Sequence, residues 1–414
     1  MARLGEAAGE MEQRTVMLHY RSRQGGADRP VVLMLLEVYW PGHDATGPNQ
    51  SIAAMCRGLA QEFEFKVVAR DGPSDFGQAD AQCGRWVDRG FVAVRYCPVS
   101  RFGAEGLGDI LRTTPHDVLM MNGFFDRNFT IPALALRRLG LVPRRPTILA
   151  PRGEFSAGAL GLKHARKQAY LLAARGLGLI DDVWLHATSE QEADEIRAGC
   201  PWARNIAVAP NIRMLGTLPQ AAPRTDDGRL RIVFLSRIDR KKNLDYAIRA
   251  LSKIRTPATF DIFGPVNDTV YWAECQELMR RLPAHVEASH RGSIPNADVP
   301  STLAGYDLFL LPTRGENFGH AIFDALEVGL PVLISDQTPW RDLERIGAGW
   351  SLPLADPDRF AATIDRLAAL EPSERDALRR SARSLAEVSL LESDAVARTR
   401  AMLIGALSHG GNIG

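Results

Sequence analysis

The chain has 414 residues, of which 45% are hydrophobic and 24% are charged, and its formal net charge is +1. A single hydrophobic core rarely extends over so many residues, so we expect a soluble protein with two domains. A net charge this close to zero provides no general attraction to nucleic acid. No nucleic-acid partner is therefore expected, and the function has to be inferred from local patterns.

Five cysteines are scattered along the chain without a Cys-x-x-Cys pair: Cys56, Cys83, Cys97, Cys200 and Cys275. Their spacing predicts neither a zinc site nor a disulfide framework, which favours a reducing compartment. The first residues show no signal peptide, and no apolar run approaches the length of a membrane span. We therefore expect a cytoplasmic protein whose residues 1–24 form a loosely ordered extension.

The first half of the chain alternates between predicted strands and helices. It opens with an apolar strand at 30–36, a helix at 49–60 and a strand at 63–69, an order that predicts a doubly wound parallel sheet. Ser189 is predicted to cap a later helix, with Glu192 completing a capping box. Further strands are predicted at 91–96, 117–121, 146–150 and 183–186.

A segment rich in Pro, Ala and Gly at 216–228 is predicted to link this half to a second domain of the same kind. Asp356 is interpreted as the cap of a helix that has Pro357 at its first position. The predicted strands of the second domain are 230–235, 260–264, 286–291, 306–311 and 331–334. Its predicted helices are 244–254, 271–282, 320–328, 357–370 and 372–391.

The polar loop 313–319 carries Glu316 and joins a predicted strand to a predicted helix. In open α/β sheets, ligands bind at the carboxyl ends of the strands, where this loop begins. The free N–H groups at the start of the helix suit a phosphate or a sugar hydroxyl. Asp324 lies two helical turns beyond Glu316, so the loop and this helix are the main candidate binding site.

The sequence Glu316-Asn-Phe-Gly-His-Ala-Ile-Phe-Asp324 resembles the donor-binding loop of the retaining, nucleotide-sugar-dependent glycosyltransferases with the GT-B fold, family four or group 1. Their signature is Glu, seven residues and Glu, with Phe-Gly after the first acid. The first acid and Phe318-Gly319 match, whereas the second acid is Asp324. The resemblance implies an α/β chain with two Rossmann-like, doubly wound domains facing a cleft. Residues 1–215 would form the acceptor domain and 216–385 the donor domain, while 386–414 would form a helix packing back on the first domain.

The resemblance also implies the catalytic residues. Arg237 and Lys242 match the family's Arg and Lys that grip the donor phosphates, and Lys241 is a rival for the second position. Fixed cations can stabilise the charge on the leaving diphosphate, so neither a metal nor another cofactor is expected. Glu316 matches the acid that contacts the donor sugar near its reacting carbon. Taken alone, an Arg–Lys loop is more typical of an ordinary exposed surface, and the binding interpretation depends on Glu316 at a second strand end of the same sheet.

Other family positions imply contacts to the rest of the donor. Asp324 would accept hydrogen bonds from the ribose, although it also fits an acid on a helix surface. His320 would contact a phosphate or help to cap its helix. The remaining donor-binding candidates are Ser236, Gly264, Asn317, Phe318 and Gly319.

Three residues of the first domain are candidates for the cleft and the acceptor. Gly47 belongs to a Gly-bearing loop, with Gly42, that would face the cleft in the family and would otherwise form a tight turn. Asn122 stands where the family often carries a pocket histidine, and Arg152 follows the predicted strand 146–150.

The segment 137–175 is locally basic, with Glu154 as its only acid. One interpretation is a solvated helix face. The other is a surface that binds a lipid-phosphate acceptor or an acidic membrane, with peripheral attachment at its inner face. Its basic residues are Arg137, Arg138, Arg144, Arg145, Arg152, Lys163, Arg166, Lys167 and Arg175.

The function implied by the resemblance is transfer of a hexosyl unit from a nucleotide sugar to a glycan or lipid-linked acceptor, with retention. One alternative is a nucleotide-sugar epimerase of the same fold, which needs no acceptor. A second is a donor-binding relic weakened at Asp324. Asp356-Pro-Asp358 fits the metal motif of the other glycosyltransferase fold, but the capping role of Asp356 is the preferred interpretation.

Overall fold

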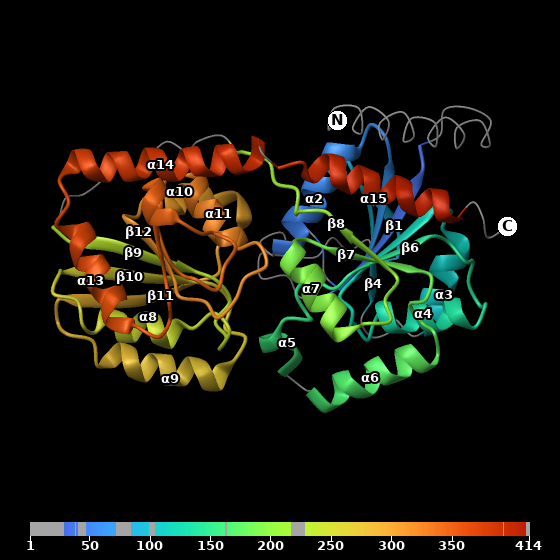
Figure 1. Cartoon of the computed structure of the whole chain (residues 1–414), viewed down its shortest axis with the longest axis horizontal. Helices are drawn as coiled ribbons and strands as arrows, with labels where there is room; N and C mark the ends of the chain where they lie inside the picture. Colours follow the sequence, from blue (N-terminus) through green and yellow to red (C-terminus); the bar gives the residue numbers. More distant parts are fainter. Residues whose placement is uncertain are drawn as a thin grey trace. The chain divides into compact units, whose positions relative to one another are not determined.

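The computed structural model describes residues 29–37, 39, 47–71, 84–98, 104–161, 164–216, 228–391 and 393–410. The chain divides into two compact units (Figure 1). Unit 1 comprises Met1–Arg213 and Ser393–Gly414, and unit 2 comprises Met214–Glu392. The predicted N-terminal extension, Gly42 and most of the predicted linker lie outside the described residues.

Unit 1 is built on an eight-stranded sheet in the order β3-β4-β2-β1-β5-β6-β7-β8. Neighbouring strands are parallel except β3, a short edge strand that the sequence does not predict and that runs antiparallel to β4. The strands are β1 (Val31–Leu36), β2 (Glu64–Asp71), β3 (Trp86–Asp88), β4 (Ala93–Pro98), β5 (Val118–Asn122), β6 (Thr147–Ala150), β7 (Val183–Ala187) and β8 (Asn205–Val208).

Helices cover this sheet, and the last of them returns from the end of the chain to lie along α2 (Figure 1). The Arg400 guanidinium donates to both carboxylate oxygens of Glu62 at 2.7–2.9 Å. Leu403 and Ala406 of the same helix are fully buried. The helices of unit 1 are α2 (Gly47–Leu59), α3 (Ala104–Thr113), α4 (Thr130–Arg138), α5 (Ala157–Gly161), α6 (His164–Gly176), α7 (Glu190–Gly199) and α15 (Ala395–Gly410).

Unit 2 is built on a parallel six-stranded sheet in the order β11-β10-β9-β12-β13-β14. Its strands are β9 (Leu230–Leu235), β10 (Ala258–Phe263), β11 (Val286–Gly292), β12 (Leu308–Leu311), β13 (Val332–Ser335) and β14 (Gly349–Leu352). The strands and helices predicted in both halves are confirmed to within a few residues at their ends.

In unit 2, α8 packs on α9, and α11 packs on α10 and α14 (Figure 1). The helix α14 runs unbroken past position 385, at which the sequence analysis placed a domain boundary, and the chain rejoins unit 1 at Ser393. Within the described residues, no helix is both long and apolar enough to cross a membrane. The helices are α8 (Leu244–Leu251), α9 (Thr269–Arg280), α10 (Val299–Leu303), α11 (His320–Glu327), α12 (Leu343–Ile346), α13 (Pro357–Ala368) and α14 (Pro372–Leu391).

Both predicted helix caps are confirmed, whereas the predicted capping box is not. The Asp356 carboxylate accepts the N–H of Arg359 at 3.1 Å, which confirms its capping role. Ser189 caps α7 as predicted, by accepting the N–H of Glu192 at 3.1 Å. The capping box is wrong, however, because the Glu192 carboxylate accepts the N–H groups of Thr188 and Gly153, at 2.8 and 2.6 Å. Both are buried donors that would otherwise lose their hydrogen bonds to water.

Each sheet has one point at which the strand order reverses. In unit 1 the reversal lies between β1 and β5, and in unit 2 between β9 and β12. The connections on the two sides of such a point run in opposite directions, which opens a crevice at the carboxyl ends of the strands. In unit 2 the loops that leave the two strands at this point are the β9 loop, residues 236–243, and the β12 loop, residues 312–319. In unit 1 the point of reversal lies beside Asn122, the last residue of β5.

Two glycines near the start of β14 allow a direct test of backbone packing. Both have positive φ, +145° at Gly349 and +79° at Gly347. A Cβ on Gly349 would lie 2.1 Å from the Val332 carbonyl oxygen, whereas one on Gly347 would be 3.4 Å from Ser381 Oγ. We expect Gly347→Ala to lower the free energy of unfolding by about 1–2 kcal/mol, from left-handed strain. Gly349→Ala should lower the free energy of unfolding by roughly 1–3 kcal/mol more, because the added Cβ would also overlap the Val332 carbonyl oxygen. Equal urea midpoints for the two variants would contradict this.

Candidate functional site

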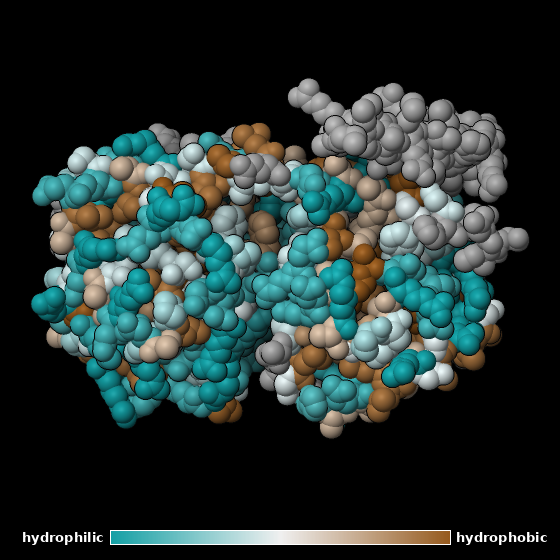
Figure 2. Space-filling view, in the orientation of Figure 1, coloured by the Kyte–Doolittle hydropathy of each residue, from teal (hydrophilic) through white to brown (hydrophobic). Residues whose placement is uncertain are grey.

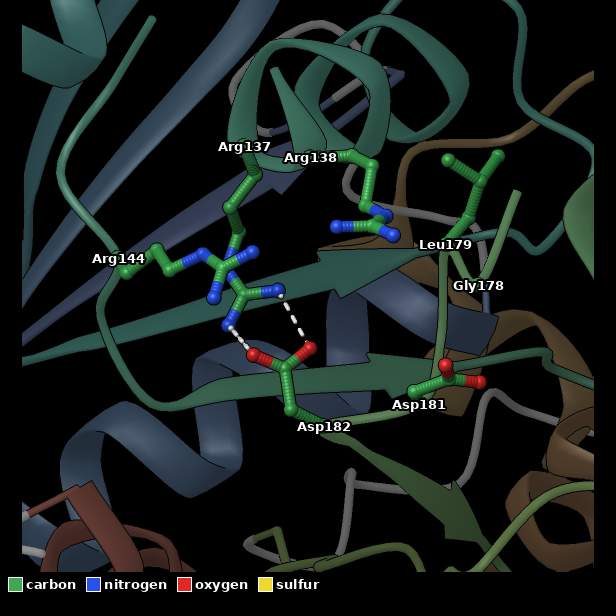
Figure 3. A pocket seen from close by; sticks show the side chains of 7 residues that line it. All are labelled: Arg137, Arg138, Arg144, Gly178, Leu179, Asp181 and Asp182. Atoms are coloured by element: carbon green, nitrogen blue, oxygen red, sulfur yellow. Dashed lines mark hydrogen bonds and ion pairs between the residues drawn. The ribbon is translucent and has the colours of Figure 1, made fainter. Parts of the chain in front are cut away.

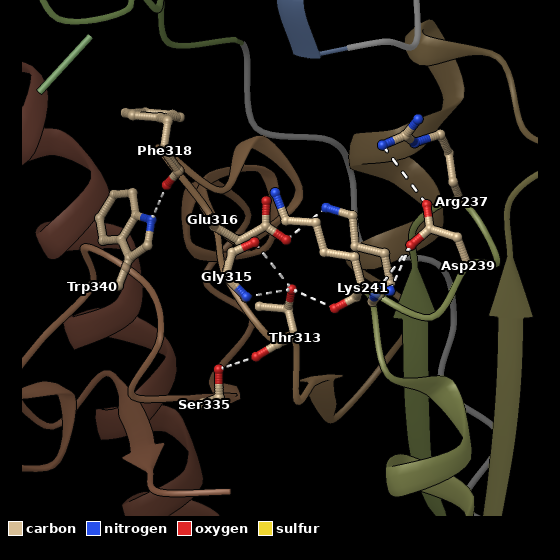
Figure 4. A network of polar contacts seen from close by, with 10 residues as sticks. Arg237, Asp239, Lys241, Thr313, Gly315, Glu316, Phe318, Ser335 and Trp340 are labelled. Carbon is tan, nitrogen blue, oxygen red and sulfur yellow. Dashed lines mark hydrogen bonds and ion pairs between the residues drawn. The ribbon is translucent and has the colours of Figure 1, made fainter. Parts of the chain in front are cut away.

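The β9 and β12 loops are joined to each other by hydrogen bonds (Figure 4). The carbonyl oxygen of Lys241 accepts the N–H of Arg314 at 2.8 Å and the hydroxyl of Thr313 at 3.2 Å. The side-chain amide of Asn243 donates to the Pro312 carbonyl oxygen at 2.9 Å. These bonds hold together two loops that are about seventy residues apart in the sequence. Functional groups on both loops are therefore fixed relative to one another.

Two of the predicted catalytic residues meet across these loops. The Lys242 ammonium lies 2.6 Å from Glu316 Oε1, and the two side chains are only 13% and 12% exposed. Charge-assisted hydrogen bonds are stronger than neutral ones, and partial burial reduces the screening of this pair by water. The Glu316 N–H donates to the Gln337 carbonyl oxygen at 3.0 Å, which fixes the backbone that carries the carboxylate.

The other cations of the β9 loop differ in exposure. Arg237 is 56% exposed, and its Nη2 lies 3.8 Å from the Asp239 carboxylate. The same carboxylate accepts the N–H groups of Lys241 and Lys242, at 3.0 and 3.2 Å, and so shapes the loop. Burial lowers the pKa of Lys241, while the neighbouring Glu316 acts to raise it. Both lysines therefore lie within the electrostatic reach of Glu316, and Lys242 is the one that forms the ion pair with it.

Gly264 is required where the end of β10 meets the β9 loop. Its φ is +137°, and a Cβ there would lie 2.0 Å from the Ser236 carbonyl oxygen. The Ser236 N–H donates to the Phe263 carbonyl oxygen at 3.0 Å, which continues the pairing of the two strands. Two predicted donor-binding residues, Ser236 and Gly264, are therefore in backbone contact.

The end of the β12 loop is shaped by a left-handed glycine and a tryptophan. Gly319 is the N-cap of α11, with a φ of +80°, and a Cβ on it would lie 2.8 Å from Ile322 Cδ1. The Trp340 indole N–H donates to the Phe318 carbonyl oxygen at 2.6 Å, and the two rings pack edge to face. Asn317, just before, is half-buried. Trp340 is not among the site residues predicted from the sequence.

The helix α11 carries the remaining donor-binding candidates. His320 is its first residue, and its ring centroid lies 4.9 Å from that of Phe318. Asp324 is only 9% exposed, so it is not a solvated acid on a helix surface. The helix begins where the β12 loop ends, and its first N–H groups lack carbonyl partners within the helix.

In unit 1, the structure brings Asn122 and Arg152 together. Arg152 Nε donates to Asn122 Oδ1, and Arg152 Nη1 donates to Asn211 Oδ1, both at 2.9 Å. The contact of Asn211 with Arg152 was not predicted from the sequence. Gly47 is the first residue of α2. Among the described residues, no group of three or more His, Cys, Asp or Glu side chains could hold a metal ion.

Comparison with known proteins gives a family match for unit 2. Residues 220–385 match the family model described as glycosyl transferases group 1. No curated protein matches the sequence.

Solved structures resemble almost the whole chain. Sucrose-phosphate synthase from Thermosynechococcus elongatus is 15% identical, with a TM-score of 0.67, and the match covers 92% of this chain and 98% of that chain. Anabaena HepE in complex with UDP and glucose is 16% identical, with a TM-score of 0.65 and coverage of 92% and 100%. WaaG, a glycosyltransferase involved in lipopolysaccharide biosynthesis, is 14% identical, with a TM-score of 0.61 and coverage of 90% and 99%. The chain therefore has the GT-B fold, and its second unit matches the group 1 glycosyl transferases.

Proposed function

We propose that this protein is a retaining glycosyltransferase of family four. It would transfer a hexosyl unit from a nucleotide-diphosphate sugar to a glycan or lipid-linked acceptor, without a metal. The observation that carries the proposal is the ion pair of Lys242 and Glu316 at the point where the sheet of unit 2 reverses. The match of this unit to the group 1 family supports it. The description of HepE as a complex with UDP-glucose supports the class of donor.

The proposed mechanism assigns the leaving group to the cations of the β9 loop. Cleavage of the bond between sugar and diphosphate leaves negative charge on the diphosphate, which preorganised cations can stabilise. Arg237 is exposed enough to reach a ligand, and the ion pair with Glu316 holds Lys242 beside the β12 loop. The amides of Phe318 and Gly319 and the hydroxyl of Ser236 would complete the phosphate site.

The carboxylates are assigned to the two sugar rings of the donor. Glu316 would accept hydrogen bonds from hydroxyls of the transferred sugar and favour positive charge as it develops on that ring. Asp324 would accept the ribose hydroxyls, either directly or through a bridging water, because it is one methylene shorter than the family's Glu. Gly264, Asn317 and His320 would line the remainder of the donor site.

We extend the proposal to a membrane-contacting surface on unit 1, defined as the exposed residues of α6, of the segment 138–145 and Leu177, which follows α6. Four leucines there are strongly exposed: Leu139 71%, Leu141 53%, Leu172 70% and Leu177 59%. The Arg138 guanidinium donates to the Leu177 carbonyl oxygen at 2.7 Å, which joins the two segments. Figure 2 shows hydrophobic and hydrophilic residues side by side in the region of α4 and α6.

The charge of this surface is suited to acidic lipid. No Asp or Glu occurs between positions 155 and 180, whereas Arg166 and Arg175 are exposed. A cavity of about 260 Å³ opens beside it, lined by Arg137, Arg138 and Arg144 and by two aspartates. In Figure 3, Arg137 is already paired with Asp182, at 2.9 Å for both bonds, which leaves Arg138 and Arg144 facing the cavity. Exposed apolar side chains among arginines are typical of surfaces that lie on anionic membranes.

The phosphate assignment predicts a large loss of nucleotide affinity in the double variant Arg237→Ala, Lys242→Ala. Each charge-assisted contact is worth about 1.5–3 kcal/mol, so the affinity for a nucleoside diphosphate should fall by about a hundredfold or more. Calorimetry in EDTA measures this nucleotide affinity. Turnover by the wild type should also persist in EDTA, because the proposed mechanism uses no metal. Arg240→Ala is the control, because Arg240 lies in the same loop but its guanidinium pairs with Glu274 at 2.6 Å. Unchanged affinity in the double variant would remove both residues from the site.

The sugar assignment predicts that Glu316→Gln lowers kcat by on the order of a hundredfold, as for the loss of one preorganised electrostatic group. Nucleotide affinity should change little, because the carboxylate contacts the sugar. Glu274→Gln, which alters an exposed ion pair of the same unit, should keep normal turnover. Steady-state kinetics with and without acceptor provide the measurement. Normal turnover in Glu316→Gln would refute the role, and donor turnover that needs no acceptor would favour an epimerase.

The membrane proposal predicts salt-sensitive binding to vesicles that contain anionic lipid. Charge reversal at Arg144 and Arg166 should abolish sedimentation with such vesicles at low salt, and added salt should do the same to the wild type. Arg281→Glu with Arg345→Glu gives the same change of net charge on unit 2, at side chains 71% and 78% exposed. This control should bind normally. Binding that neither salt nor the Arg144 and Arg166 reversals reduce would contradict the proposal.

A further inference from the structure

We propose that the Arg152 guanidinium and the Asn122 amide form a binding site for an oxyanion, a phosphate or carboxylate group carried by the acceptor. This deepens the proposed function, and it depends on that function only in naming the ligand as the acceptor. The residues all belong to unit 1 and lie at the carboxyl edge of its sheet. Asn122 ends β5, beside the point where the strand order reverses, and Arg152 follows β6, which pairs with β5.

Arg152 is oriented by hydrogen bonds to neutral side chains. Its Nε and Nη1 donate to the side-chain oxygens of Asn122 and Asn211, which are uncharged amides. Its Nη2 donates to none of the described residues, and burial lowers the pKa of Arg152 only to about 10, so the guanidinium stays charged at neutral pH. Arg137 of the same unit offers the contrast, because its buried guanidinium meets both oxygens of the Asp182 carboxylate.

The carboxylate that acts on Arg152 is already occupied. Glu192 is 1% exposed, and its oxygens accept hydrogen bonds from Gly153 and from the backbone and hydroxyl of Thr188. It raises the pKa of Arg152 but does not bond to it. Among the described residues, Arg152 therefore has no hydrogen-bonded counterion. Because its guanidinium is half-buried and still charged, an oxyanion that accepts from Nη2 would form a charge-assisted hydrogen bond.

A second donor and the backbone of Arg152 support the same conclusion. Asn122 is 8% exposed, and its Nδ2 has no hydrogen-bond partner among the described residues. A buried donor without a partner costs free energy that a ligand oxygen would recover. Arg152 has a φ of +55°, an unusual conformation for a side chain other than glycine, and such strain is concentrated at binding and catalytic sites.

His186, which neighbours Arg152, does not add positive charge to the site. His186 Nε2 donates to the Ala209 carbonyl oxygen at 2.8 Å, and Nδ1 has no partner among the described residues. Burial, assisted by the cation of Arg152, lowers the pKa of His186 to about 3. The ring is therefore neutral at physiological pH. The site offers the two donors of Arg152 and Asn122 to an anion, and the planar fork of arginine matches carboxylate and phosphate.

The test measures anion binding to the full chain saturated with UDP, so that the β9 loop is already occupied. The probes are inorganic phosphate, a hexose 6-phosphate, a hexuronate and a neutral hexose, with calorimetry as the readout. We expect the anions to bind and the neutral hexose not to bind. A short-chain polyprenyl phosphate in micelles that binds more tightly than the hexose 6-phosphate would identify a lipid-linked source, and the reverse order would identify a soluble one.

Asn122→Asp is the decisive variant, because it keeps the shape and the bond to Nε but gives Arg152 a counterion. Anion affinity should fall at least tenfold, with a thermal midpoint no lower than that of the wild type. Arg152→Gln should show the same loss and gives an independent reading if Asn122→Asp does not fold. Arg197→Gln is the matched control, because Arg197 is an arginine of the same unit that is 52% exposed and lies outside both proposed binding surfaces, and it should bind normally.

The proposal is overturned if the anions do not bind the wild type, or if they bind the wild type, Asn122→Asp and Arg152→Gln equally. UDP affinity separates this result from a failure of the proposed function. A chain that binds phosphate through Arg152 but does not bind UDP keeps the anion site and loses the glycosyltransferase assignment. A chain that binds UDP but none of the probe anions loses the anion site and keeps the glycosyltransferase assignment.

Discussion

The ion pair between Lys242 and Glu316 depends on β9 and β12 being neighbours in the sheet. The two residues are 74 positions apart in the sequence, and the parallel sheet brings their strand ends to one edge. The backbone bonds between the two loops then remove the freedom that would otherwise separate two side chains at a surface. Preorganisation of this kind makes an electrostatic group effective, because no further ordering is needed when a ligand binds.

The candidate sites of the two units differ in the partners of their cations. In unit 2, Lys242 is paired with a carboxylate, so a ligand anion there has to share or replace an existing partner. In unit 1, Arg152 donates to two neutral amides, and none of its hydrogen-bond partners among the described residues carries a charge. Both arrangements lie at the carboxyl edge of a doubly wound sheet, where strand order reverses nearby. The fold positions each cation at the carboxyl edge of a sheet, and the hydrogen-bond partner of that cation determines which ligands can bind there.

Close backbone contacts set the shape of the donor loops as much as the charges do. Gly264 allows β10 to approach the carbonyl oxygen of Ser236, and Gly319 lets the chain turn into α11 against Ile322. Trp340 then fixes the Phe318 carbonyl oxygen from a separate segment. Asn243 begins α8 in a left-handed conformation and holds the β12 loop through its side chain. These constraints explain why a short polar loop can keep one conformation.

The sequence by itself determined the alternation of strands and helices, the cap at Asp356 and the loop that carries Glu316, because each depends on residues close together in the chain. The contacts of Arg152 with Asn211, of Trp340 with Phe318 and of Glu192 with Gly153 were decided only by the tertiary structure. They join segments whose proximity follows from strand order, which local periodicity does not encode. Glu192 shows the consequence, since its spacing from Ser189 fits a capping box, while the fold supplied buried N–H groups that bind its carboxylate instead.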